Sequence, residues 1–279
     1  MFFPPMLLET AKTVFSSSDY IFETKYDGIR LIYSNVTEPI LYTRNKGIAT
    51  KQFPELLPNL PPDTVLDGEA MVFDPLGRDD FEGIKKRFFM RKDEKIKQSV
   101  ISHPVTYMVF DILYHEGKDL RNLPLMERKE ILFDLISDNR TISKVSFIET
   151  NGEELFQKAR KNNLEGIVAK GKNSTYIGRR SSNWLKIINW IETTAIITGY
   201  RKSDHALVCC HEDLSPLGIV LTGMTPVHRE AFFKIAKTII KGEDRDNFYL
   251  EAHLKCRLKG RAFTSKGILR SPQFIDFIL

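Results

Sequence analysis

The sequence predicts an α+β protein of two domains, a mixed domain over residues 1–188 and a small β-barrel domain over residues 189–279. Three observations lead to this prediction. The chain has 279 residues, 42% of them hydrophobic, which is enough for two domains that each bury a core. Strand-like and helix-like segments mix without a regular βαβ alternation, which favours antiparallel sheets. Beyond about residue 189 the pattern becomes mostly strand-like.

In the first domain the predicted strands are short, rich in Val, Ile, Tyr and Phe, and bounded by Gly, Asp, Asn or Pro. They cover residues 20–25, 30–34, 40–44, 64–73, 105–113 and 166–169. Leu and Phe recur at helical spacing over residues 126–136 and 152–162, and residues 82–89 form a third candidate helix.

In the second domain strands are predicted over residues 195–200, 206–210, 217–222 and 249–261, with one helix over residues 225–240. Several strands around a single helix are typical of a small β-barrel, with the OB-fold as the leading candidate. A short hinge is expected at residues 189–193 because no low-complexity linker separates the two parts.

Composition excludes several classes of protein. No apolar run approaches the roughly 20 residues that a membrane-spanning helix needs. The three cysteines (Cys209, Cys210 and Cys256) suit neither a disulfide framework nor a paired C-x-x-C zinc site. A reducing cytoplasm is the expected location. The N-terminal residues lack the pattern of a signal peptide.

The net charge of +5 is mild, but its distribution is informative. Residues 166–191 and 253–274 contain no acid, and such stretches suggest a path for a polyanion. In the second stretch four cations recur with period 2, which places them on one face of a strand at roughly 6–7 Å spacing, about the separation of DNA phosphates. They are Lys255, Arg257, Lys259 and Arg261. The alternative is an edge strand protected by charge.

The most informative motif is K-Y-D-G-I-R at residues 25–30. Lys25 follows a predicted strand and precedes a tight-turn signal at Asp27-Gly28, so its amine can point into a cleft. A lysine amine becomes a nucleophile when burial or neighbouring cations lower its pKa from about 10.4. The alternative is an ordinary surface lysine at a turn.

Further motifs follow in a fixed order. They are P-M-L-L at residues 5–8, Y-T-R-N-K-G at 42–47, F-P-E at 53–55, L-D-G-E-A at 66–70, F-E-G-I at 81–84 with Arg87, F-D-I-L-Y at 110–114, E-G-I-V-A-K at 165–170, W-L-K-I at 184–187 and L-R-S-P-Q-F at 269–274. With K-Y-D-G-I-R, this series resembles the ATP-dependent DNA ligases over essentially the whole chain. The nearest in style are small bacterial or prophage ligases and the ligase module of bacterial end-joining proteins.

The resemblance implies a nucleotidyltransferase (adenylation) domain followed by an OB-fold domain. It implies a monomeric enzyme that uses ATP with Mg²⁺ or Mn²⁺ to seal 3′-OH/5′-phosphate nicks in double-stranded DNA. The intermediates would be lysyl-AMP on Lys25 and adenylylated DNA. Replication, base-excision repair, recombination by end joining and phage DNA maintenance all require this reaction.

The resemblance also implies roles for individual residues. Glu69 and Glu165 would hold the metal, since carboxylate oxygens suit Mg²⁺. Phe110 would stack on adenine and Glu23 would accept from its amino group. The alternatives are turn or capping glutamates and a phenylalanine of the core.

The remaining roles concern phosphate and sugar oxygens. Lys170 and Lys186 would contact the α-phosphate and, as neighbouring cations, lower the pKa of Lys25. Arg30 and Arg44 would hold anionic oxygens, Arg44 those of the 5′-phosphate at the nick. Arg270 would orient pyrophosphate. Asp27 would lie near the 3′-hydroxyl.

One position departs from the family pattern, because Ile188 replaces the second lysine of W-x-K-x-K. This predicts an active but slower enzyme. Three rival functions stay open at this level: an RNA ligase, a GTP-using capping enzyme, and an inactive nucleic-acid-binding homologue.

Overall fold

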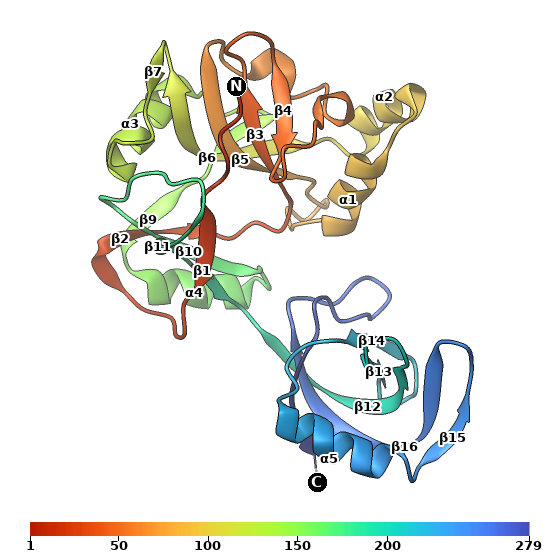
Figure 1. The fold of residues 1–279 in the computed structure, drawn as a ribbon. Coiled ribbons are helices and arrows are strands. Elements are labelled where there is room, and N and C mark those ends of the chain that lie inside the picture. The colour runs from red at the N-terminus through yellow and green to blue at the C-terminus, as the bar shows by residue number, and fades with distance from the viewer. Residues whose placement is uncertain (279) are drawn as a thin grey trace. The chain divides into compact units, whose positions relative to one another are not determined.

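The computed structural model describes residues 1–278, and the chain divides into two compact units, Met1–Ile187 and the part from Ile188 onward. Both units are built around antiparallel sheets with few helices, as expected from the irregular mixture of strand and helix patterns (Figure 1). Within residues 1–278 no helix is long and apolar enough to cross a membrane.

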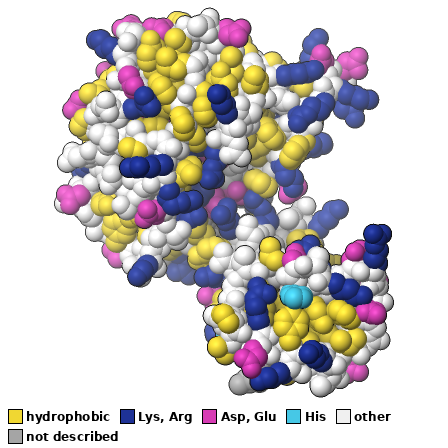
Figure 2. All heavy atoms as spheres, in the orientation of Figure 1, with side chains coloured by type: hydrophobic (Ala, Val, Ile, Leu, Met, Phe, Trp, Pro, Cys, Tyr) yellow, Lys and Arg dark blue, Asp and Glu magenta, His cyan; other side chains and the backbone are white. Residues whose placement is uncertain are grey.

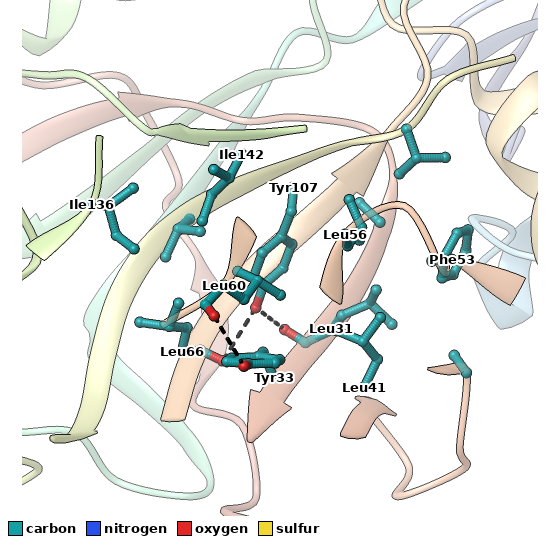
Figure 3. Close-up of a cluster of buried hydrophobic side chains, with 14 of the residues drawn as sticks. Leu31, Tyr33, Leu41, Phe53, Leu56, Leu60, Leu66, Tyr107, Ile136 and Ile142 are labelled. Carbon is teal, nitrogen blue, oxygen red and sulfur yellow. Dashed lines mark hydrogen bonds between the residues drawn. The ribbon is translucent and has the colours of Figure 1, made fainter. Parts of the chain in front are cut away.

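The first unit contains a sheet with strand order β4-β3-β5-β6-β7, and β8 pairs with β6 in parallel. The strands are β3 (Ile29–Ser34), β4 (Ile40–Thr43), β5 (Thr64–Met71), β6 (Thr106–His115), β7 (Lys118–Asp119) and β8 (Ile142–Lys144). The main core of the unit lies against this sheet (Figure 3). In it the hydroxyl of Tyr107 donates to the carbonyl of Leu31 at 2.9 Å, so a buried polar group is satisfied across two strands.

A second sheet of the same unit has the order β1-β11-β10-β2-β9. Its strands are β1 (Leu7–Thr10), β2 (Ser17–Thr24), β9 (Phe147–Thr150), β10 (Gly166–Gly171) and β11 (Arg180–Ile188). β1 pairs with β11 in parallel, and the other pairings given for this sheet are antiparallel.

Six short helices complete this unit. The first five are η1 (Thr50–Gln52), η2 (Leu57–Asn59), α1 (Phe81–Phe89), α2 (Asp93–Ser102) and α3 (Leu125–Leu135). A sixth, α4 (Gly152–Lys161), buries Ala159 against β2 and β10. This packing supports the strand ends from which the site described below is built.

The second unit is a six-stranded sheet of order β14-β13-β12-β16-β15, with β17 also paired to β16. Its elements are β12 (Ile191–Arg201), β13 (Leu207–Cys210), β14 (Pro216–Val220), α5 (Pro226–Ala236), β15 (Ile240–Glu243), β16 (Asn247–Gly260) and β17 (Gln273–Ile278). A bridge between Thr222 and Gln273, with the Phe274 amide donating to the Thr222 carbonyl at 2.9 Å, joins the chain after β14 to β17. The sheet therefore curls into a barrel around a buried core that includes Leu207, Cys256 and Phe232.

The predicted helix over residues 225–240 was wrong at its C-terminal end. Helix α5 stops at Ala236, and Ile240 instead begins β15, where it pairs with Leu250 of β16. The sequence also did not reveal α2, in which only Ile96 and Ser99 are buried, or strands such as β7 with no buried residue. Such elements lack the apolar periodicity on which sequence interpretation depends.

Candidate active site

Lys25 lies immediately after β2, where its backbone amide donates to the carbonyl of Gly166 at the start of β10 at 3.0 Å. Its Nζ lies 2.7 Å from Oε2 of Glu165, and the exposed fractions of the two side chains are 18% and 3%. The amine is therefore held inside the unit but is still reachable from solvent. The sequence led us to expect cations around Lys25, whereas its nearest charged partner is an acid.

Gly28 allows the turn after Lys25 to pack directly on β5. A Cβ atom at this position would lie 2.3 Å from the carbonyl oxygen of Ala70 and 2.3 Å from the sulfur of Met71. Any side chain would push the turn away from β5 and therefore from Glu69. The motif therefore requires glycine at position 28 for a steric reason.

Glu69, on β5, is the second carboxylate at the site. Burial raises its pKa to about 7, although nearby Lys25 and Arg30 lower it, and the charge of Glu165 raises it further. Two carboxylates that repel each other are suited to share a cation. Among residues 1–278 no group of three or more His, Cys, Asp or Glu side chains forms a ready-made metal site, so phosphate and water oxygens would have to complete the ligands of a hard cation.

Asp79 is a site residue that the sequence did not reveal. Its Oδ2 accepts a hydrogen bond from the backbone amide of Asp27 at 3.0 Å, which ties the turn of the motif to the start of α1. Burial raises the pKa of Asp79 to about 6, and the charges of Asp27 and Glu165 also raise it. Asp79 has no sequence signal, because an acid just before a helix is common.

Glu23 is buried between two lysines rather than open to a base. One oxygen accepts from Lys129, and the other lies 2.6 Å from Nζ of Lys170. All three side chains are almost completely buried. Burial lowers the pKa of Lys170 to about 8, although Glu23 opposes that shift. Lys129 was not predicted, since nothing in the pattern of α3 distinguishes it from a solvated helix lysine.

Phe110, on β6, is half-buried and has cations on its ring. Nζ of Lys170 lies 4.2 Å and the guanidinium carbon of Arg30 lies 4.7 Å from the ring centroid, while Trp184 meets it edge-on at 6.2 Å. An aromatic face lined by cations suits a base attached to phosphates. Phe110 therefore joins Lys170 and Arg30 to the same site.

Arg30 is held mainly by a structural partner. Its Nε and Nη2 bind the buried carboxylate of Asp67 at 2.6 and 2.5 Å, and Nη2 also donates to the carbonyl of Met6 at 3.2 Å. Asp67 in turn accepts from the hydroxyl of Tyr176 at 2.6 Å. Among the described residues Nη1 of Arg30 makes no hydrogen bond, so this side chain would contact a ligand through Nη1 alone and not as a bidentate fork.

Two other motif elements are structural. The buried guanidinium of Arg87 pairs with Glu55 at 2.8 Å, which links the F-P-E element to α1. Asp111 of F-D-I-L-Y makes a fully buried bidentate pair with Arg128 at 2.8 Å. These motifs hold the core together and need no ligand to explain them.

The remaining predicted residues of the first unit lie at its surface or edge. Arg44 is exposed in the turn after β4, and Asp27 and Lys186 are half-buried. Ile188, at the end of β11, is buried with 7% exposure. These positions by themselves assign no role.

In the second unit, Lys255, Arg257 and Lys259 alternate with buried Cys256 and Leu258 along β16. Arg261 was predicted on the same strand face, but β16 ends at Gly260 and Arg261 lies in the following turn.

Two cations of β16 have side-chain neighbours, one an acid and the other an aromatic ring. Lys255 pairs with Glu212 at 3.1 Å, and Lys259 lies 5.0 Å from the ring centroid of Trp190. Arg270 is half-buried, and its backbone pairs with Arg261 and Ala262. The row is therefore basic but partly compensated by acid.

Comparisons with known proteins agree with the geometry. The family model of the ATP-dependent DNA ligase domain matches residues 5–187. The SPbeta prophage-derived DNA ligase-like protein LigB of Bacillus subtilis (strain 168) is 39% identical over 277 residues, which cover 98% of each chain. The bifunctional non-homologous end joining protein LigD of the same organism is 28% identical over 287 residues, 93% of this chain but 46% of LigD.

A solved structure from a study of Lig E DNA ligases, concerned with DNA binding by a minimal scaffold, superimposes with a TM-score of 0.73 over 100% of both chains. At 17% sequence identity this likeness concerns the fold alone. It extends the agreement to the barrel unit, which lies beyond the residues that the family model matches.

Proposed function

This chain belongs to the family of ATP-dependent DNA ligases, and we propose that it seals 3′-OH/5′-phosphate nicks in duplex DNA with AMP carried on Lys25. The observation that carries the proposal is the network around this amine. Lys25 contacts Glu165 and interacts electrostatically with Glu69. Glu69 also interacts with Arg30, whose guanidinium lies on the Phe110 ring. A nucleophile, two carboxylates and an aromatic face thus belong to one unit.

In the first reaction Nζ of Lys25 attacks the α-phosphorus of ATP, so that a P–N bond forms and the P–O bond to pyrophosphate breaks. The amine must lose a proton before it attacks. Oε2 of Glu165, at 2.7 Å, accepts a hydrogen bond from Nζ and restrains the direction of the amine. Such positioning is a large part of catalysis in phosphoryl transfer.

When ATP binds, Phe110 would stack on adenine. Nζ of Lys170 would leave Glu23 and contact the α-phosphate instead. Both oxygens of Glu23 already face lysines, so its contact with the adenine amino group uses a remaining lone pair. When Lys170 moves, Lys129 still neutralises Glu23. The pair of lysines therefore permits the exchange without leaving a buried charge uncompensated.

Mg²⁺ or Mn²⁺ would be held by Glu69 and Glu165 and would neutralise charge on the phosphates. Burial raises the pKa of Glu69 and the charge of Glu165 adds to that rise, so the two carboxylates repel each other, which supports this assignment. A cation would also relieve the cost of burying Glu69 as an anion.

The two later reactions move AMP to the 5′-phosphate of the nick and then release it as the 3′-hydroxyl attacks. Arg44 is exposed and forms no salt bridge within residues 1–278, so it is suited to hold the 5′-phosphate. Asp27 lies in the turn beside Lys25, where the 3′-hydroxyl would meet it. We assign the cations of β16 to the DNA backbone and Arg270 to pyrophosphate.

The proposal is tested by incubation with α-³²P-labelled ATP and Mg²⁺. We expect a covalent AMP adduct that Lys25→Ala abolishes and that Lys161→Ala, an exposed lysine of α4, leaves unchanged. Labelled GTP should give no adduct, which separates a ligase from a capping enzyme. An adduct that persists in Lys25→Ala would overturn the assignment.

Sealing assays then separate a DNA ligase from an RNA ligase. Nicks with DNA/DNA, DNA/RNA and RNA/RNA junctions are compared in the same duplex context. We expect the DNA/DNA nick to be sealed fastest. A preference for RNA/RNA junctions would contradict the proposal.

A further inference from the structure

Helices α1 and α2 carry a cluster of cations that the reaction described above does not use. They are Lys85, Lys86, Arg91, Lys92, Lys95 and Lys97, which we call the α1–α2 basic surface. All are exposed except Lys85, which is half-exposed. Figure 2 shows Lys and Arg side chains gathered at this corner of the first unit, in the upper right of the view. The sequence analysis did not single out this segment.

Acidic side chains compensate this charge only in part. The only acids on the two helices are Glu82, which pairs with Lys85 at 2.9 Å, Glu94, and Asp93, which pairs with Lys51 from outside the helices at 2.6 Å. Within residues 1–278, Lys86, Arg91, Lys92, Lys95 and Lys97 form no salt bridge. Clustered like charges repel one another, and a polyanion would remove that cost.

The position of this surface relative to the nucleophile is fixed within the first unit. Asp79 accepts from the amide of Asp27, and the next residue, Asp80, caps α1 by accepting from the Gly83 amide at 2.8 Å. Helix α1 therefore starts beside the turn that carries Lys25 and leads away from it. Its nine residues span about 13 Å, which is the rise of about four base pairs of duplex DNA.

We propose that the α1–α2 basic surface binds the phosphodiester backbone of the duplex on the 3′-hydroxyl side of the nick, several base pairs from the reacting ends. The choice of side rests on the proposed function, in which Asp27 lies near the 3′-hydroxyl. Five of the six cations of this surface are lysines, which are single charges on flexible side chains and contact phosphates without reading bases. The surface therefore contributes affinity without sequence preference.

The test uses a variant in which Lys86, Lys92 and Lys95 are all replaced by Gln, because Gln keeps helix propensity and removes charge. The matched control replaces Lys158, Arg160 and Lys161 of α4 by Gln, three exposed cations that lie on the other sheet of the unit. Binding to fluorescent nicked duplex with a dideoxy 3′ end, which cannot be sealed, is measured by anisotropy over a range of salt concentrations.

We expect the α1–α2 variant to bind about 10- to 100-fold more weakly near 0.1 M salt, with a salt slope smaller by about 2–3. The α4 control should bind as the unmodified protein does. Equal losses in the two variants would reduce the effect to overall charge and overturn the proposal. Unchanged binding in the α1–α2 variant would overturn it as well.

Shortening one arm of the duplex tests on which side of the nick the α1–α2 basic surface binds. When the arm on the 3′-hydroxyl side is cut to about three base pairs, shorter than α1 spans, the difference between variant and unmodified protein should disappear. Shortening the 5′-phosphate arm should leave the difference intact. The reverse result contradicts the placement.

AMP labelling with ATP alone distinguishes a failure of the proposed ligase function from a failure of DNA binding by the α1–α2 basic surface. DNA takes no part in that step, so the variant should form the adduct and thereby show an intact first unit. Failure of the unmodified protein to form the adduct would count against the proposed function. Normal labelling and sealing with identical DNA binding by both variants would count against the α1–α2 surface alone.

Discussion

Nζ of Lys25 and Oε2 of Glu165 lie 2.7 Å apart although 140 residues separate them in the chain. The contact exists because β2 and β10 pair antiparallel and Lys25 and Glu165 flank the paired ends. The pair uses one oxygen of the carboxylate, and a divalent cation on the same carboxylate would compete with the amine for its negative charge. Binding of the cation would therefore loosen the pair.

We predict that Glu165→Gln slows AMP labelling by about 10²–10³-fold, since a preorganised charge at the reacting phosphate is lost. The control is Glu154→Gln, an exposed acid of an i,i+4 pair on α4. Labelling rates are measured over a Mg²⁺ titration. Labelling of Glu165→Gln at the unmodified rate across the titration would disprove this role.

Glu69→Gln is expected to change the pH dependence of stability. Burial raises the pKa of Glu69 from 4.5 to about 7, so the folded protein holds this proton more tightly than the unfolded chain. The stability from this group is present below pH 4.5 and is lost as pH rises through about 7. Glu69→Gln avoids that loss and should melt about 2–6 °C higher than the unmodified protein at pH 8, with little difference near pH 4.5.

Thermal melts of ligand-free protein across this pH range provide the measurement. Glu130→Gln, an exposed acid of α3, is the control and should follow the unmodified protein at every pH. The difference in melting temperature between Glu69→Gln and the unmodified protein should be larger at pH 8 than at pH 4.5. A smaller difference at pH 8 would contradict the prediction.

Lys129→Met should destabilise the first unit by about 2–3 kcal/mol, because a buried carboxylate loses one of two cations. Urea unfolding measures the change. Lys158→Met removes an exposed lysine of an i,i+4 pair and should cost less than about 0.5 kcal/mol. AMP labelling should also slow, since Lys170 becomes the remaining lysine on Glu23. Equal stability of the two variants would show that Lys129 is dispensable.

Arg87 and Arg44 both belong to the motif series but should respond in opposite ways. Arg87→Met leaves Glu55 buried without its cation and should cost about 3–5 kcal/mol in urea unfolding. Arg44→Met removes an exposed side chain and should leave stability within about 0.5 kcal/mol while it slows transfer of AMP to the 5′-phosphate. Loss of stability in Arg44→Met would mean that its role is structural.

Ile188→Lys restores the lysine that the family pattern contains at this position. If a missing phosphate contact limits the first step, AMP labelling should become faster. The site is 7% exposed, so urea unfolding of the same variant must be compared, with Ile188→Met as the control of similar volume. Slower labelling at unchanged stability would contradict the explanation.

Local patterns predicted most of the fold because many of its elements have one buried and one exposed side. Residues 152–162 and 30–34, for example, correspond closely to α4 and β3. Mostly exposed elements such as α2 and β15 were not predicted, since they bury few or no side chains and therefore lack apolar periodicity.

The motif residues were found in sequence because each chemical role demands a residue type within a short string. Lys25, Glu69, Glu165 and Phe110 were all identified in this way, and the structure brings them together. Lys129 and Asp79 were not found, because their importance depends on partners 106 and 52 residues away.

The sequence by itself determined the family, and it predicted the nucleophile and the order of the domains, since these depend on residue identities along the chain. Only the tertiary structure decided that Glu23 and Arg30 are engaged by buried partners, that Arg87 and Asp111 are structural, and that helix α1 begins beside the turn after Lys25. The physical reason is that the energy of a charge depends on its burial and on its neighbours in space, and neither is encoded in a short stretch of chain.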